Sequence, residues 1–273
     1  MSEQAALILV DSHAHLDLPD FGADRDEVIE RAGKSGVKYI LCPLDISSRE
    51  SLGQGFKLKE QRNNIYLAAG LHPHDAKRLR PDHFVQIKEM AAASEIVAIG
   101  EIGLDFHYNF SPPDKQLEAF SQQLALASEL KLPVIIHSRE AASQIIEIIK
   151  SLPYSGGGIL HCFSEDWPQA KAMVDLGFLV SFSGILTYER AAGVQEAARR
   201  LPLDVLLVET DSPYLTPYPD KKMAKRNEPA FVVTTARKLA GLKNLSLDQV
   251  AEATSANFFR FFRLKKTGSD VKI

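Results

Sequence analysis

Eight short apolar segments recur along the chain, and the residues between them have the spacing of amphipathic helices. The segments are 7–11, 37–43, 65–71, 96–101, 133–138, 157–162, 178–184 and 205–211. Continuous apolar runs of this length are typical of parallel strands that are buried on both faces. Their alternation with helical segments is the pattern of βα units. The sequence therefore predicts an α/β fold, a single (β/α)8 TIM-type barrel.

Helices are expected wherever apolar residues repeat every three or four positions. Helical segments lie between all the predicted strands, and examples are 24–34, 113–130, 140–151, 168–176 and 189–200. Two further helical patterns, 230–241 and 246–262, follow the last strand, and the second opens with a Ser-Leu-Asp N-cap signal. A doubly wound open sheet is the alternative architecture, and a glycine-rich phosphate loop normally follows its first strand. Residues 11–15 read DSHAH instead, which favours the barrel.

One domain accounts for nearly the whole chain. The 273 residues contain neither a linker-like stretch nor a repeat of fixed period beyond the βα alternation. We expect a hydrolase domain at 1–264 and a polar tail at 265–273.

Localisation and charge are the next constraints. The apolar runs are shorter than the roughly 20 residues of a membrane-spanning helix, and the first residues lack the basic and long apolar regions of a signal peptide. Cys42 and Cys162 are expected to be free thiols in a reducing compartment, so we expect a cytoplasmic protein.

The net charge of -3 argues against a broad DNA-binding surface but allows a local basic patch.

Six residues of metal-binding type lie where the predicted strands end. His13 and His15 follow the first strand, and the others end strands four, five, six and eight: Glu101, His137, His161 and Asp211. In a closed parallel barrel these ends meet at one mouth, and the spacing of His13 and His15 turns both side chains to one side. Four imidazoles and two carboxylates exceed the needs of one tetrahedral ion, so two ions are predicted.

Each of these residues also has an ordinary structural interpretation. His137 or His161 alone would be read as a hydrogen-bonded core histidine. Asp211 alone fits a helix N-cap or a turn, and Glu101 alone fits an ion pair with an arginine. The coincidence of all six at strand ends favours the metal site.

The same segments resemble a known family. LVDSHAHLD, AAGLHPH, AIGEIGLDFH, LPVIIHSREA, LHCFS, LLVETDSPYLTP and KRNEPAFV are similar, in this order, to the successive motifs of TatD-type deoxyribonucleases. The resemblance implies an amidohydrolase-like barrel, a divalent-metal centre and hydrolysis of DNA. It assigns the six residues as metal ligands, with Glu101 as the bridging ligand. Two departures affect substrate fit: Glu165 follows LHCFS where glycine is common, and the loop 220–224 is longer and more basic.

The predicted metal ligands lead to a hypothesis about how the phosphodiester is hydrolysed. Two divalent ions, Zn, Mg or Mn, would neutralise the phosphodiester and activate a water that attacks phosphorus. Asp211 would accept or orient the proton of that water, and Glu101 would bridge the ions. A narrow mouth would favour exonuclease action on single strands or free ends.

Positive and polar groups near the mouth are candidates for holding DNA. They are Arg139, His72, His74, Lys225 and Arg226. Arg139 fits equally well as a surface residue paired with Glu140, and the basic run 221–226 fits a solvated loop. The aromatic residues in these loops could stack on bases or pack in the core: Phe106, Tyr108, Phe163 and Tyr214.

Two other function classes remain open at this point. The same mouth can hydrolyse a small ester, lactone or amide, because neither fold nor metals select the substrate. A non-catalytic metal-dependent binding protein is the second alternative, although it does not need a full dinuclear centre. DNA as substrate is the expected partner, and no obligate protein partner is predicted.

Overall fold

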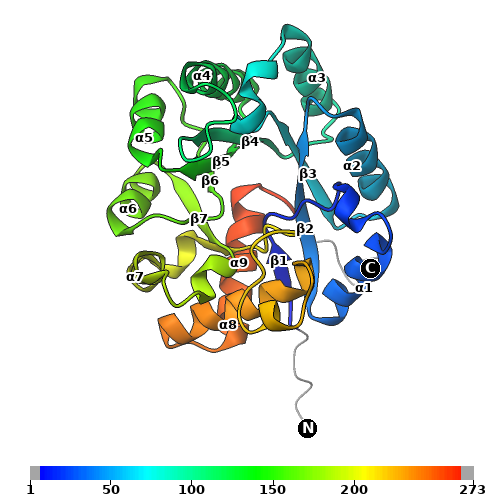
Figure 1. Ribbon diagram of the computed structural model, residues 1–273, viewed down its shortest axis with the longest axis vertical. Coiled ribbons are helices and arrows are strands. Elements are labelled where there is room, and N and C mark those ends of the chain that lie inside the picture. Colours follow the sequence, from blue (N-terminus) through cyan, green and yellow to red (C-terminus); the bar gives the residue numbers. More distant parts are fainter. Residues whose placement is uncertain (1–6, 266–273) are drawn as a thin grey trace.

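Eight parallel strands form a ring inside a ring of helices in the computed structural model, which describes residues 7–265 (Figure 1). Each strand pairs with the next one along the chain, which confirms the predicted (β/α)8 barrel. The strands are β1 (Leu9–Asp11), β2 (Val37–Asp45), β3 (Ile65–Gly70), β4 (Ala98–Asp105), β5 (Val134–Arg139), β6 (Gly158–Leu160), β7 (Phe178–Phe182) and β8 (Leu206–Val208).

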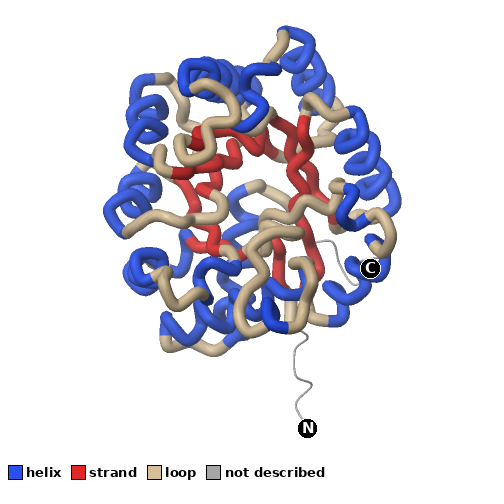
Figure 2. The backbone as a smooth tube through the Cα atoms, in the orientation of Figure 1, coloured by secondary structure: helices blue, strands red, loops and turns tan. Residues whose placement is uncertain are grey.

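Helices lie between consecutive strands and after the last strand, and most of them cover the outside of the ring (Figure 2). They are α1 (Arg25–Lys34), α2 (Arg49–Gln61), α3 (Pro81–Ala92), α4 (Pro113–Leu130), α5 (Ala142–Ser151), α6 (Trp167–Asp175), α7 (Ala192–Arg200), α8 (Val232–Lys243) and α9 (Leu247–Phe261). Within residues 7–265, no helix is long and apolar enough to cross a membrane. Of the predicted tail 265–273, residues 266–273 lie outside the described residues.

Several helices begin later than their sequence patterns predict. The helix expected at 140–151 starts at Ala142, because Glu140 adopts a left-handed backbone conformation with φ of 55°. The helix expected at 230–241 starts at Val232, because Pro229–Phe231 forms a 3-10 turn first. Helix α9 starts where expected, and Ser246 caps it by accepting a hydrogen bond from the backbone N of Gln249.

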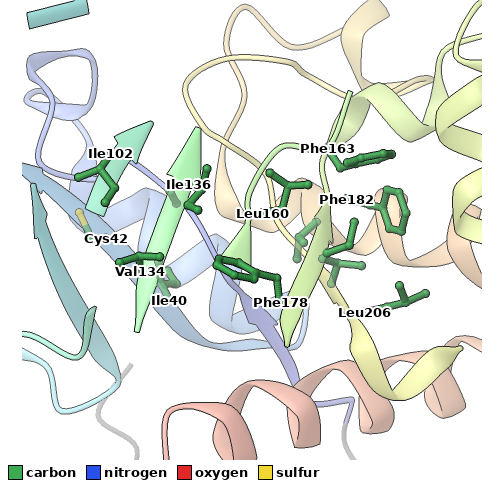
Figure 3. Packing of buried hydrophobic residues seen from close by; sticks show 14 of the residues in the cluster. Ile40, Cys42, Ile102, Val134, Ile136, Leu160, Phe163, Phe178, Phe182 and Leu206 are labelled. Atoms are coloured by element: carbon green, nitrogen blue, oxygen red, sulfur yellow. The ribbon is translucent and has the colours of Figure 1, made fainter. Parts of the chain in front are cut away.

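Two layers of apolar side chains explain why the strands read as continuous apolar runs. Ile136, Leu160 and Phe182 of neighbouring strands point outwards and pack with other buried side chains under the helices (Figure 3). Successive residues of a strand point to opposite faces, so Ile135 and Ile159 belong to the inner layer. Burial on both faces leaves little room for polar residues inside the strands.

Helix α9 covers the N-terminal end of the barrel. Its Phe258 and Phe259 pack against the inner layer, and Asn257 donates hydrogen bonds to the carbonyls of Leu203 and Leu206 at 2.8 Å each. Ser255 donates to the carbonyl of Ile8 at 3.0 Å. The opposite, C-terminal end is the one that carries the polar residues.

The barrel closes between the segments that follow β1 and β8. Ser12 N donates to the Val208 carbonyl at 3.1 Å, and His15 N donates to the Ser212 carbonyl at 2.9 Å. In the other direction, Asp211 N donates to the His13 carbonyl at 2.9 Å. The residues that close the barrel are therefore neighbours of the predicted metal ligands, and three of them, His13, His15 and Asp211, are predicted ligands themselves.

Candidate metal centre

All six predicted ligands lie together at the C-terminal mouth of the barrel. His13 and His15 follow β1, His161 follows β6 directly, and Asp211 lies three residues beyond β8. Glu101 does not end its strand as predicted. After a register irregularity between Ile99 and Ile102, β4 pairs with β5 as far as Asp105.

The carboxylate of Glu101 lies at the centre of the cluster, and its oxygen Oε2 faces one set of donors. His13 Nε2 lies 3.3 Å from this oxygen, and His15 Nε2 lies 3.7 Å from it. The two imidazole nitrogens are 3.2 Å apart. Asp211 Oδ1 completes the set, at 3.5 Å from His15 Nε2 and 3.9 Å from His13 Nε2.

The other oxygen of Glu101, Oε1, faces a second set of donors. His161 Nε2 lies 2.8 Å from it and His137 Nδ1 lies 2.9 Å from it. His72 Nε2 is the third neighbour, at 3.1 Å. His72, predicted from the sequence as a substrate contact, thus lies among the candidate ligands.

Burial and charge set the protonation of the cluster. Burial alone would raise the pKa of Glu101, but the surrounding imidazoles, His161 and His72 foremost, hold that pKa well below its ordinary value. Burial lowers the pKa of His72 to about 4. Glu101 is therefore ionised and His72 neutral at pH 7, whereas the neighbouring carboxylates raise the pKa of His15, His137 and His161.

The donor set fits divalent cations. The Nε2 atoms of His13 and His15 face each other and the same carboxylate oxygen, an arrangement of ligands around a common point. The Nδ1 atom of His13 is buried and has no hydrogen-bond partner among the described residues. Imidazole nitrogens combined with carboxylate oxygens suit Zn²⁺ and also admit Mn²⁺.

Asp105 contacts the imidazoles of His137 and His74. The sequence analysis does not single it out. Its Oδ2 lies 3.2 Å from His137 Nε2 and 2.9 Å from His74 Nε2. Its Oδ1 accepts hydrogen bonds from the backbone N of His107 and of Tyr108 at 3.0 and 2.8 Å. The alternation of side chains along β4, which puts residues 101, 103 and 105 on one face, is the signal that identifies it.

Glu209 has the same role for His161. Its Oε1 lies 3.3 Å from His161 Nδ1 and accepts a hydrogen bond from Cys162 N at 2.7 Å. A carboxylate behind a ligating imidazole fixes the orientation of the ring and makes it a stronger ligand. Glu209 lies two residues before Asp211, and this spacing is the sequence feature that could have identified it.

Gly103 allows β4 and β5 to approach closely at this point. It has a φ of 143°, and a Cβ atom on it would lie 2.0 Å from the carbonyl oxygen of His137. Only glycine fits both this backbone conformation and this space. The close approach of β4 and β5 sets the position of His137 relative to Glu101. It therefore requires that residue 103 has no side chain.

A cavity of about 1020 Å³ opens over the cluster. Arg139, His72 and His74, three of the predicted substrate contacts, line it. Glu165, the departure noted after LHCFS, also lines it and accepts a hydrogen bond from Ser138 at 2.6 Å.

The other two predicted substrate contacts lie away from this cavity. Arg226 binds Asp24 with Nη2 at 2.6 and 2.7 Å from the two carboxylate oxygens, and its guanidinium lies 4.5 Å over the ring of Phe21. Lys225 is exposed and does not line the cavity. We therefore do not include Lys225 and Arg226 in the proposed substrate site.

Comparison with known proteins agrees with the site. A family model described as TatD related DNase matches residues 10–263. YabD of Bacillus subtilis, named an uncharacterized metal-dependent hydrolase, is 39% identical over 259 residues, which cover 94% of this chain and 100% of YabD. The 3'-5' ssDNA/RNA exonuclease TatD of Erwinia tasmaniensis is 35% identical over 260 residues, with 94% and 100% covered. The crystal structure of YjjV, a TatD homolog of Escherichia coli K12, has a TM-score of 0.86 at 30% identity and covers 94% of this chain and 98% of its own.

The barrel and its buried cluster of histidines and carboxylates define a metal-dependent hydrolase with an amidohydrolase-like fold that binds divalent metal. Within this class, the chain belongs to the TatD family.

Proposed function

We propose that this protein hydrolyses phosphodiester bonds of DNA at a centre where Glu101, lying between two sets of donors, would help to hold two divalent ions. The observation that carries the proposal is the division of donors around one buried carboxylate. Oε2 of Glu101 faces His13 and His15, and Oε1 faces His137 and His161. The DNA substrate is supported by the family description and by the exonuclease name of the Erwinia relative.

The side chains divide the work of the reaction. Two bound cations would neutralise phosphate oxygens and supply hydroxide near neutral pH. Both oxygens of Glu101 are engaged by imidazoles, so its role is to hold the two halves of the centre together. Asp211 lines the cavity beside His15 and has its second oxygen free of the close contacts described, so it accepts the proton of the attacking water.

We expect groups at the rim of the cavity to orient the substrate. Arg139 lines it two residues beyond His137 and presents a guanidinium that suits a phosphate. The cavity lies at the barrel mouth, and we expect it to take an end or an unpaired segment of a strand in preference to a duplex. We therefore propose exonuclease action on single strands or free ends. The cytoplasmic location and the independence from a protein partner stay predictions.

Hydrolysis of a labelled single-stranded oligonucleotide tests the proposal. Protein stripped by a chelator should be inactive, and adding back Mg²⁺, Mn²⁺ or Zn²⁺ should restore cleavage, with a product ladder that reveals the direction of digestion. His137→Ala should remain inactive with every ion. If the folded wild-type protein binds the ions but cleaves no oligonucleotide, the DNA substrate is wrong, and a panel of small esters, lactones and amides becomes the next test.

A further inference from the structure

Exposed aromatic rings lie at the mouth of the barrel: Tyr108 and Tyr214 line the cavity, and Phe110 stacks on Tyr108. Tyr108 is 48% exposed, Phe110 58% and Tyr214 54%. In contrast, Phe163 in a neighbouring loop is 2% exposed, and Phe106 packs against the core. Large apolar rings that gather at the rim of a functional cavity indicate a surface that binds something.

The first two of these rings form one preassembled surface. The rings of Tyr108 and Phe110 are nearly parallel, at an interplanar angle of 7° and a centroid distance of 5.3 Å. Their backbone is held by polar contacts of main-chain atoms: Tyr108 N donates to Asp105 Oδ1 at 2.8 Å, and Lys77 Nζ donates to the Phe110 carbonyl at 2.9 Å. A ligand that stacks on these rings does not have to order them first.

This ring pair lies on the Oε1 side of the metal centre. The imidazole of His74 meets Phe110 edge to face at 4.7 Å and reaches Asp105, which also holds His137. The guanidinium of Arg139 lies 4.6 Å over the ring of Tyr108. An aromatic surface and a phosphate-binding cation therefore stand next to each other.

Tyr214 lies on the other side of the centre, next to the donors around Oε2. Its ring meets that of His15 edge to face at a centroid distance of 6.2 Å, and it lines the cavity. Its backbone N donates to the Asp211 carbonyl at 2.9 Å, so the main chain holds the residue and the side chain remains half exposed. The two aromatic surfaces thus flank Glu101.

We propose that these rings are base-stacking subsites on either side of the scissile phosphate, with Tyr108 and Phe110 forming one and Tyr214 the other. The inference rests on the proposed nuclease function and adds the residues that would recognise unpaired bases in its substrate. Stacking on a side chain requires a base face that no neighbouring base covers, and it accepts every base because each has a π-face. The recognised feature is therefore single-strandedness, without preference for sequence.

Equilibrium binding separates the stacking role from catalysis. The probe is a fluorescein-labelled oligothymidylate with phosphorothioate linkages that resist cleavage, bound to the metal-loaded protein and followed by anisotropy. The second probe is an abasic chain of the same length and charge. The variants are Tyr108→Ala, Phe110→Ala and Tyr214→Ala, with Tyr108→Phe to keep the ring. Tyr218→Ala is the matched control, because Tyr218 is 45% exposed but its ring packs with Tyr188 and Lys221 and contacts none of the three proposed stacking rings.

Each alanine variant should bind the oligothymidylate roughly 5- to 150-fold more weakly than wild type, the range that loss of one base–aromatic stack gives. Binding of the abasic chain should change little, and Tyr108→Phe and Tyr218→Ala should match wild type. Unchanged oligothymidylate affinity in all three alanine variants would overturn the stacking subsites and leave the nuclease proposal standing, as would an equal loss for both probes. A wild-type protein that neither binds nor cleaves oligonucleotides would overturn both proposals.

Discussion

Oδ2 of Asp105 lies 3.2 Å from Nε2 of His137, at the ring edge opposite to the nitrogen that faces Glu101. A carboxylate in this position fixes the tautomer and the orientation of a ligating imidazole. Asp105→Asn should therefore weaken divalent-metal binding by about 10- to 100-fold while the fold is kept. Competition with a fluorescent zinc chelator measures this. Asp75→Asn is the control, because Asp75 lines the same cavity but pairs with Arg78. Equal metal affinity of Asp105→Asn and wild type would refute the role of Asp105.

Asp211→Asn tests the proton acceptor. Asparagine keeps the shape and one ligand oxygen but cannot take up a proton, so turnover at saturating metal should fall by about 10²- to 10⁴-fold. Circular dichroism and thermal unfolding should show an intact fold. Glu140→Gln serves as a control, since Glu140 lines the cavity and pairs with His107. Wild-type turnover in Asp211→Asn would assign proton transfer to another group.

Arg139→Ala should weaken binding of single-stranded oligonucleotide and make it less sensitive to salt. Loss of one phosphate contact reduces the slope of log K against log salt by about 0.7 for single strands. The slope should not change in Lys225→Ala, because Lys225 is exposed and lies outside the cavity. An unchanged slope in Arg139→Ala, or an equal change in both variants, would contradict the assignment.

Arg226→Gln should reduce stability and not substrate affinity. Its hydrogen bonds hold the pKa of Asp24 below the ordinary value of 3.8, so the stabilisation is present above that value and disappears as the pH falls below it. The melting temperature of the variant should be a few degrees lower than wild type at pH 7, and this difference should shrink as the pH falls below 3.8. Oligonucleotide affinity should equal that of wild type. A variant that loses affinity with unchanged stability would restore Arg226 to the substrate site.

Gly103→Ala should destabilise the protein by about 2–4 kcal/mol, because the new methyl group would collide with the His137 carbonyl in a backbone conformation that suits glycine. Urea unfolding gives the difference. Gly241 in α8 is a matched control: a Cβ there meets no atom within 4 Å, and Gly241→Ala should stabilise by about 0.5–1 kcal/mol. Equal stability of Gly103→Ala and wild type would show that β4 and β5 adjust to the added group.

The sequence predicts the barrel well, because strands buried on both faces leave continuous apolar runs. It misplaces the end of β4, since the run stops at Glu101 while strand pairing continues through Gly103 to Asp105. Asp105 is missed for that reason. The ion pair of Arg226 is missed for a different reason. Its partner Asp24 lies 202 residues away in the sequence, and no local sequence pattern indicates such a pair. Contacts between loops form only when the barrel is closed, so they cannot be predicted from one segment. The apolar run of each strand, in contrast, is visible in that segment alone.

The closing edge of the barrel divides the candidate ligands between the two ends of the chain. His13 and His15 stand on one side of that edge and Asp211 on the other, joined by the hydrogen bonds between the two segments. The donors around Oε2 of Glu101 are therefore complete only when the segment after β8 docks against the segment after β1. On the proposed role of Asp211, a chain truncated before this residue should lack hydrolytic activity.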